Sequence, residues 1–287
     1  MPTLIDLRRR IRSVKNTQQI TKAMKTVATA KFKKTQRTVV EHRPLWHAAP
    51  DLLSRIAGWT GTAAHPLFTV RDERRVHVIV ITSDKGLCGA FNANLLSRAL
   101  EFVVDKARSS QVGLVLIGKK AVNFFRKYAY PVERAFGERT DRIDPAELSA
   151  LARYLIRLYV YQETDGVYLA YNEFKSVLAP RITVLRLLPV TPPAAAPSPP
   201  TPAPEWEPGI PELLETLVPR YIEDQIRHAY AESQAAEQAA RMMAMDNASK
   251  NAETLFGDLL LVLNKIRQAS ITKELLEIMN AVEAMKK

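Results

Sequence analysis

The sequence predicts an α/β plus coiled-coil protein, in which two long terminal helices pair antiparallel and an α/β domain is inserted between them. The first observation is that residues 3–43 contain no proline or glycine, and residues 220–287 contain no proline and one glycine. The second is that strand-like apolar runs alternate with helical patterns over residues 75–190. The third is a proline-rich stretch that separates this middle part from the last helix.

The N-terminal segment has the spacing of a helix with a narrow apolar seam. Its first apolar side chains recur at intervals of three and four residues: Leu4, Leu7, Ile11 and Val14. We expect Pro44 and Pro50 to kink or end this helix, because proline lacks the backbone N–H that a helix interior needs. Residues 1–60 are therefore predicted to form the N-terminal helix of the coiled coil.

The middle segment predicts a Rossmann-like α/β domain over residues 61–190. The strand-like runs are "VHVIVIT", "VGLVLIG", "GVYLAYN" and "RITVLRLLPV". Helical patterns lie between them, near residues 90–108, 119–128 and 144–162. Strands that alternate with helices in this way favour a largely parallel sheet.

The last third of the chain predicts a linker followed by a very long helix. Residues 189–211 hold ten of the eighteen prolines, so we assign 191–211 as an extended linker or loop and 212–287 as the C-terminal helix. Apolar residues again recur at intervals of three and four: Leu255, Leu259, Val262 and Ile266, then Ile271, Leu275, Ile278, Val282 and Met285. A helix of this length needs a partner, and the N-terminal helix can provide one.

The charges of the two ends are complementary. Residues 1–43 hold 12 Lys/Arg against 2 Asp/Glu, whereas residues 205–287 hold 9 against 14. Opposite charge favours pairing of these segments, but a basic arm that binds nucleic acid is an alternative. The basic charges are spread around the helix, and Phe32 is the only aromatic residue available for stacking there. We therefore favour a solvated or partner-facing helix over a nucleic-acid site.

Composition argues against several classes of site. Cys88 is the only cysteine, so neither an intramolecular disulfide nor a cysteine-based zinc site is expected. The five histidines lack metal-ligand spacing, and we expect no metal and no cofactor. No run of about 18 apolar residues is present, so we expect no insertion into the membrane, and the N-terminus does not resemble a signal peptide.

The stretch "SDKGLCGAFN" at 83–92 lies between a predicted strand and a predicted helix, where phosphate-binding loops occur. A P-loop would carry GxxxxGK[ST], but Gly86 and Gly89 are followed by no Lys-Ser/Thr pair. A tight turn that uses glycine is the favoured interpretation, and a nucleotide-binding α/β switch protein is the alternative. Cys88 near the helix start is a nucleophile candidate, but we favour a small buried turn residue.

Three stretches resemble the γ subunits of bacterial F-type ATP synthases. They are "RRRIRSVKNTQQITKAMKTVATAK" at 8–31, "SDKGLCGAFN" at 83–92, and "PRYIEDQIRHAYAESQAAEQAARMMAMDNASKNAE" at 219–253, which is followed by "LNKIRQASITKELLEI" at 263–278. The resemblance runs from end to end, and the first and third stretches are long enough to be specific. It implies that the loop at 83–92 is a structural marker and that nucleotides bind to other chains.

The resemblance implies a non-catalytic rotor subunit that couples ion-driven rotation of the c-ring to ATP synthesis or hydrolysis at the catalytic β subunits. It also implies control of ATPase activity and of proton flow. The expected partners are the hexamer of α and β subunits, the ε subunit and the c-ring, with one copy of this chain per complex and no nucleic acid. The expected location is the cytoplasmic face of the bacterial inner membrane, as a peripheral protein. The α/β domain would be the foot, near the membrane.

The resemblance also assigns contact residues. It implies that Arg267 and Gln268 hydrogen-bond a loop of the β subunit and that Met24 faces the β subunit lever. Trp206 stands near a position of the foot that contacts the c-ring. Four seam residues match the tip that turns in an apolar sleeve: Leu275, Ile278, Val282 and Met285.

The sequence departs from the family pattern at a few places. The proline-rich segment 191–204 is unusual, Leu263 stands where tyrosine is usual, and Asn280 stands where glycine is usual. These departures concern the geometry of the foot and the packing of the tip. No insert with paired cysteines is present, so thiol control of the chloroplast type is not expected.

Overall fold

The computed structural model describes residues 4–60, 65–136, 143–177, 180–191, 207 and 209–285. The chain divides into two compact units. One comprises Met1–Ala28 with Met242–Lys287, and the other comprises Thr29–Arg241. The long terminal helices each contribute residues to both units, whereas the sheet belongs entirely to the second unit.

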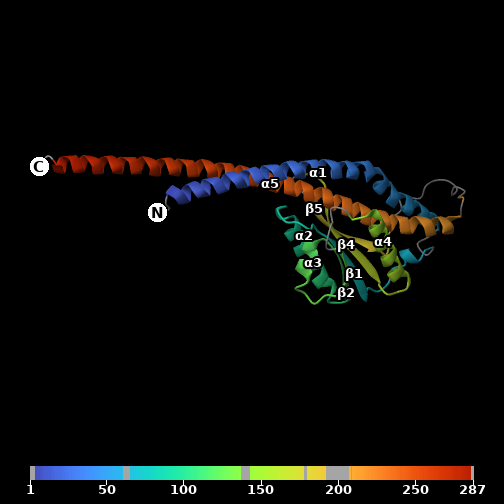
Figure 1. The fold of residues 1–287 in the computed structure, drawn as a ribbon. Helices are drawn as coiled ribbons and strands as arrows, with labels where there is room; N and C mark the ends of the chain where they lie inside the picture. Colours follow the sequence, from blue (N-terminus) through green and yellow to red (C-terminus); the bar gives the residue numbers. More distant parts are fainter. Residues whose placement is uncertain are drawn as a thin grey trace. The chain divides into compact units, whose positions relative to one another are not determined.

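The elements follow the order that the sequence predicts, with two additions, the 3₁₀ helix η2 and the strand β3. The helices are α1 (Leu4–Thr60), the 3₁₀ helix η2 (Pro66–Phe68), α2 (Phe91–Lys106), α3 (Lys119–Phe125), α4 (Pro145–Val160) and α5 (Ile210–Met285). The strands are β1 (Arg75–Ile81), β2 (Gln111–Ile117), β3 (Val132–Phe136), β4 (Gly166–Glu173) and β5 (Arg181–Leu188). Figure 1 shows these elements along the chain.

The sheet is largely parallel, as predicted. Its strand order is β3-β2-β1-β4-β5; the first four strands are parallel, and β5 pairs antiparallel with β4. The order reverses between β1 and β4, which is the arrangement of Rossmann-like folds. β3 is the strand that the sequence patterns miss. It is short and mostly exposed at the sheet edge, so it carries no apolar run.

Alternate residues of the strands pack into two separate cores. The odd-numbered side of β1 faces α4 and the first part of α5, where Ile79 and Ile81 pack with Leu151 and Ile222. The even-numbered side faces α2 and α3, where Val78 packs with the buried apolar side chains of those helices. Both faces are covered, which explains why these strands are continuously apolar in the sequence.

The N-terminal helix differs from expectation at its prolines. α1 continues to Thr60 with Pro44 and Pro50 inside it, so of the two expected outcomes, a kink or an end, the helix does not end at either proline. Figure 1 shows α1 bending along this part of its course, as expected where proline removes a backbone donor. Leu53 and Ile56 lie beyond both prolines and are buried in the core that side chains of the sheet, α4 and α5 form. This burial offsets the hydrogen bonds that the prolines cannot make.

The two terminal helices pair antiparallel in the first unit. The Thr21 hydroxyl accepts a hydrogen bond from Ser249 at 2.7 Å, and Lys25 pairs with Asp246 at 2.6 Å. Residue numbers thus rise along α1 as they fall along α5, which is the predicted orientation. Burial of Leu7 and Met245 in this unit agrees with a packed seam.

The last part of α5 is exposed. Every residue from 271 to 281 is exposed, although many are apolar. The exposed apolar side chains beyond Gly257 include Leu261, Val262, Ile271, Leu275, Leu276, Ile278, Met279 and Met285. Exposed apolar surface of this extent is typical of a surface that a partner covers.

Candidate functional site at the contact of α5 with the sheet

Buried charged side chains of α5 bind backbone atoms at the carboxyl ends of β1 and β4. In a doubly wound sheet, ligands bind at this point because the strand order reverses there and the loops diverge. The loop 82–90 follows β1, and Phe174 follows β4. Both are contacted here by α5, between residues 232 and 241. We call this region the junction, and define it by the loop 82–90, Arg43, Phe174 and α5 residues 232–241.

The loop after β1 is closed by its own side chains. Asn92 accepts a hydrogen bond from the Ser83 N–H at 3.1 Å and donates to the Cys88 sulfur at 3.1 Å. Two residues of this loop have positive φ, Gly89 at 59° and Leu87 at 63°. The glycine adopts this conformation freely, whereas Leu87 does so at a cost and with an exposed side chain.

Arg241 joins this loop to α5. Its Nη2 donates to the backbone oxygens of Lys85 and Gly86, both at 3.3 Å, and its Nη1 pairs with Glu237 at 2.6 Å. The side chains of Arg241 and Glu237 are only 11% and 14% exposed. Burial raises the pKa of the Glu237 carboxyl, and the Arg241 charge acts against this rise. Glu237, one turn earlier, therefore orients the guanidinium toward the loop.

A second polar contact joins α1, α5 and the end of β4. Glu232 is 1% exposed and accepts a hydrogen bond from the Phe174 N–H at 2.8 Å. Arg43 on α1 donates to the Phe174 carbonyl at 2.8 Å and lies 3.4 Å from the Glu232 carboxylate. Burial raises the pKa of Glu232, whereas the Phe174 N–H and Arg43 lower it. A buried charge with two donors of this kind fixes the register of all three segments.

Small side chains let α5 approach the sheet closely between these polar contacts. Ala235, Ala236 and Ala239 are buried in a cluster with Phe91 and Cys88. In the same cluster the rings of Phe32 and Phe174 meet edge to face at 5.3 Å. The alanine-rich part of α5 is therefore a packing surface, as expected of alanine at close helix contacts.

The position that would hold a nucleotide in a related sheet is filled by α5. Arg241 covers the loop after β1, and Ser233 donates to the Ile81 carbonyl at the end of β1 at 3.4 Å. This geometry supports the interpretation that the loop is a turn that binds a helix, and it disfavours a phosphate-binding loop. Cys88 is 2% exposed, and burial raises the pKa of its thiol, which disfavours the thiolate that a nucleophile requires.

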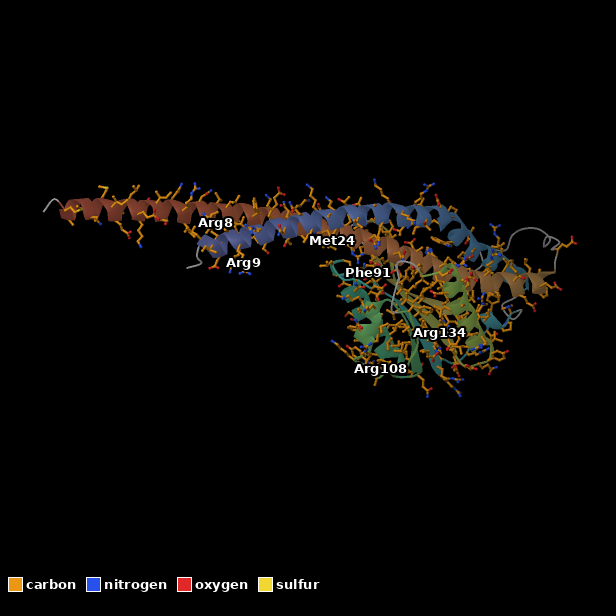
Figure 2. All side chains as sticks on the ribbon, in the orientation of Figure 1. Arg8, Arg9, Met24, Phe91, Arg108 and Arg134 are labelled. Atoms are coloured by element: carbon orange, nitrogen blue, oxygen red, sulfur yellow. The ribbon has the colours of Figure 1, made fainter. Side chains whose placement is uncertain are left out.

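The structure places the sequence-predicted contact residues on α1 and α5. Arg267 and Gln268 are exposed on α5, and Met24 is half-buried on α1 (Figure 2). Leu275, Ile278 and Met285 are exposed on the last part of α5. Val282 lies in the same helix, but its side chain is outside the described residues, and so is all of Trp206.

Sequence reasoning missed the four charged side chains that make the polar contacts of the junction: Arg43, Glu232, Glu237 and Arg241. A signal for three of them is present. Glu232, Glu237 and Arg241 interrupt a stretch of α5 in which most neighbours are alanine, and Glu237 and Arg241 stand four residues apart. Nothing local in the sequence indicates that their partners are backbone atoms of distant loops.

Two kinds of feature are absent from the part of the chain that the structure describes. Within those residues, no helix is long and apolar enough to span a membrane. In the same residues, no group of three or more His, Cys, Asp or Glu side chains is arranged to hold a metal ion.

Comparison with known sequences decides the family. A profile of the family described as ATP synthase matches residues 3–285. The chain is 42% identical over 297 residues to the ATP synthase gamma chain of Desulforudis audaxviator, which covers 99% of this chain and 100% of the relative. The chain belongs to the ATP synthase γ chain family. A gamma chain from Geobacter sp. M21 is also 42% identical, over 100% of both chains.

Solved structures agree on the fold. The γ chain fold resembles a chain of the Euglena gracilis mitochondrial ATP synthase with a TM-score of 0.69 and 20% identity, over 98% of this chain and 94% of the other. A central stalk and c-ring structure from Tetrahymena thermophila gives a TM-score of 0.62 and 23% identity, over 80% and 99%. The prediction of a central-stalk rotor subunit of an ATP synthase is thereby confirmed.

Proposed function

We propose that this γ chain transmits torque through the junction, from the α/β domain as the foot to the terminal helices as the shaft. The observation that carries the proposal is the pair of buried polar contacts made by Arg241 and Glu232. They bind α5 to backbone atoms at the carboxyl ends of β1 and β4. A force applied to the α/β domain would therefore pass to α5 through the rigid end of the sheet.

The proposed partners are those of the family. The last part of α5 enters the hexamer of α and β subunits, and the foot contacts the c-ring and the ε subunit, with one γ chain per complex. The exposed apolar side chains of Leu275, Ile278 and Met285 support the contact with the hexamer, because contiguous exposed apolar surface is typical of a surface that binds a partner. Val282 belongs to the same proposed tip. Trp206 remains the proposed foot contact with the c-ring.

We further propose that the chain has no catalytic site and that it changes the β subunits by contact. An asymmetric rotor that meets the three β subunits in turn gives each a different set of contacts, and each conformation has a different affinity for nucleotide. The proposed location is the cytoplasmic face of the inner membrane. The proposed parts of the chain are the N-terminal helix at 1–60, the foot at 61–190, the linker at 191–211 and the C-terminal helix at 212–287.

The proposed contacts with β are Arg267, Gln268 and Met24. Both α5 residues are exposed, so their polar groups are available to a partner. A charged donor contributes roughly 1.5–3 kcal/mol per hydrogen bond when its acceptor is shielded from water. One β subunit faces this side of α5 at a time, so the contact acts at one angular position in each catalytic step.

The test is the double variant Arg267→Ala with Gln268→Ala in the reassembled complex. We expect slower ATP synthesis and hydrolysis with normal assembly of α and β, and a longer dwell at one angle in single-molecule rotation. The control is Lys265→Ala, which removes a neighbouring exposed charge of α5. Wild-type dwell times in the double variant, at normal subunit stoichiometry, would reject the contact.

A further inference from the structure

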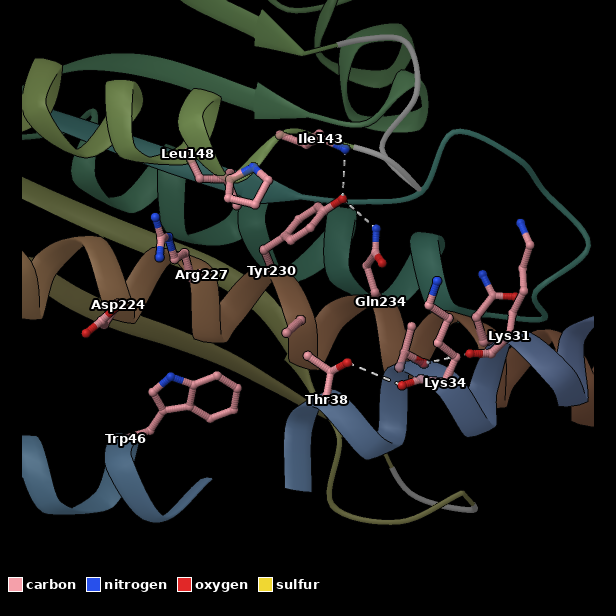
Figure 3. A pocket seen from close by; sticks show the side chains of 14 residues that line it. Lys31, Lys34, Thr38, Trp46, Ile143, Leu148, Asp224, Arg227, Tyr230 and Gln234 are labelled. Atoms are coloured by element: carbon pink, nitrogen blue, oxygen red, sulfur yellow. Dashed lines mark hydrogen bonds between the residues drawn. The ribbon is translucent and has the colours of Figure 1, made fainter. Parts of the chain in front are cut away.

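A cavity of about 560 Å³ lies in the second unit, against the part of α5 that takes part in the junction. Three elements of the second unit line it: α1, the start of α4 and the part of α5 before residue 239 (Figure 3). Its volume is in the range that small-molecule sites occupy in proteins, about 300–1,000 Å³. The polar contacts of Arg241 and Glu232, which carry the torque proposal, use none of the side chains that line it.

Aromatic rings line the middle of the cavity. The Trp46 ring from α1 and the Tyr230 ring from α5 form two of its walls, with Leu148 of α4 above them (Figure 3). The Tyr230 hydroxyl accepts hydrogen bonds from the Ile143 N–H at 3.3 Å and from Gln234 at 2.6 Å, so its ring is held in place. Fixed aromatic walls favour a planar apolar ligand, because little side-chain entropy is lost on binding.

One end of the cavity is positively charged. Lys31 and Lys34 stand there one helical turn apart on α1 (Figure 3). Among the described residues, the Lys34 ammonium has no ion pair or hydrogen bond. Burial raises the pKa of the Glu237 carboxyl, and the charge of Lys31 acts against this rise, so Lys31 has a neighbouring carboxylate. At the other end, Arg227 is already compensated, since it pairs with Glu223 at 2.5 Å and donates to Ser149 at 2.8 Å. The unmatched charge is therefore at the lysine end.

We propose that this cavity binds a small amphipathic anion. The flat apolar body would lie between Trp46 and Tyr230, and a carboxylate, sulfonate or phosphate group at one end would meet Lys34. The other end carries both a cation and a carboxylate, Arg227 and Asp224, so the lysine end is the one that favours an anion. The aromatic walls favour this ligand over a free inorganic anion, which would gain nothing from the rings. The site is independent of the torque proposal, because it uses neither Arg241 nor Glu232.

The test uses two probes that share one ring system. Anilinonaphthalene sulfonate carries an anionic group, and N-phenyl-1-naphthylamine is the same molecule without it. The full chain is prepared with Trp59→Phe and Trp206→Phe, which leaves Trp46 as the only tryptophan. Quenching of Trp46 emission then reports binding at this cavity and not at the exposed apolar end of α5.

We expect saturable quenching by both probes, with tighter binding of the sulfonate. Lys34→Ala should weaken the sulfonate about two- to fivefold, the range for a partly exposed ion pair, and should leave the neutral probe unchanged. The matched control is Lys33→Ala, an exposed lysine of α1 that does not line the cavity. Ala231→Phe should fill the cavity and abolish binding of both probes.

Three results would overturn the proposal. The first is the absence of Trp46 quenching by either probe. The second is an equal affinity for the charged and neutral probes that Lys34→Ala does not change, which would indicate an apolar cavity without preference for anions. The third is a loss of affinity for the sulfonate probe in Lys33→Ala that is as large as the loss in Lys34→Ala. Near-ultraviolet circular dichroism confirms folding of each variant, and Lys34→Ala alone decides the outcome if Ala231→Phe does not fold.

Discussion

Replacement of Arg241 by alanine tests the junction directly. The change removes the two hydrogen bonds that Arg241 Nη2 donates to the Lys85 and Gly86 carbonyls, and it leaves Glu237 without the guanidinium that pairs with it. Glu237 can then stay ionised without a partner or take up a proton. For a glutamate of ordinary pKa 4.5, protonation at pH 7 costs about 3.4 kcal/mol, at about 1.36 kcal/mol per pH unit. This cost is the upper limit of the electrostatic contribution to the loss of stability in Arg241→Ala, because Glu237 can always take up a proton instead.

We therefore expect Arg241→Ala to lower the free energy of opening of the loop by about 3 kcal/mol at pH 7. This agrees with the general cost of breaking a buried ion pair, about 3–5 kcal/mol. The double variant Glu237→Gln with Arg241→Ala has no unpaired carboxylate. It should lose less than about 2 kcal/mol, which corresponds to the missing hydrogen bonds alone.

The assay is hydrogen exchange of the segment 83–92 in the full chain, read by mass spectrometry. The control is Arg220→Ala, which removes an exposed arginine from α5. The same variants in the reassembled complex should hydrolyse ATP but pump fewer protons per ATP, because the foot is held less firmly. A double variant as destabilised as Arg241→Ala, or a loss below about 1 kcal/mol in Arg241→Ala, would refute the reasoning.

The remaining predictions concern strain, packing and pH. Leu87→Gly should protect the loop against hydrogen exchange by up to about 1 kcal/mol, because leucine adopts its φ of 63° at a cost; increased exchange would contradict this. Ala239→Leu should destabilise the second unit in urea by about 1–3 kcal/mol through overpacking, whereas Ala269→Leu on the exposed part of α5 should be neutral; equal effects would disprove close packing. The pKa of Asp246 is lowered by Lys25 and Lys250, so its stabilisation is present above the ordinary pKa of 3.8 and is lost as pH falls through the lower folded value. Asp246→Asn should therefore flatten the acid-induced loss of helix measured by circular dichroism, and an unchanged acid transition would show that the pair contributes nothing.

The sequence alone determined the elements that depend on short-range periodicity. A three- and four-residue spacing such as Leu4, Leu7 and Ile11 specifies one face of a helix, and a continuous run such as "VHVIVIT" specifies a strand that is covered on both faces. Both signals lie within a few residues, so no knowledge of the fold is needed to find them. The motifs at each end of the chain likewise identify the family, because they are long, continuous stretches that do not depend on tertiary contacts.

The limits of the sequence appear where a tertiary contact overrides the local signal. Pro44 and Pro50 predict either a kink or an end of the N-terminal helix, and the sequence alone does not decide between them. Burial of Leu53 and Ile56 beyond both prolines outweighs the two missing donors, so α1 continues. β3 carries no apolar run, because it lies at an edge where its side chains meet solvent. In both cases the sheet and its covering helices decide the outcome.

The junction was also decided by the tertiary structure. Arg241 binds backbone oxygens that lie 156 and 155 residues earlier in the chain, and Glu232 binds an N–H that lies 58 residues earlier. Backbone atoms have no side-chain signature, so a residue that binds them leaves no matching pattern elsewhere in the sequence. The loop after β1 has the strand–glycine–helix order of a phosphate site, and only the position of α5 shows that a helix fills it. Local sequence sets which segments are helices and strands, whereas burial and the reversal of strand order set which distant groups meet.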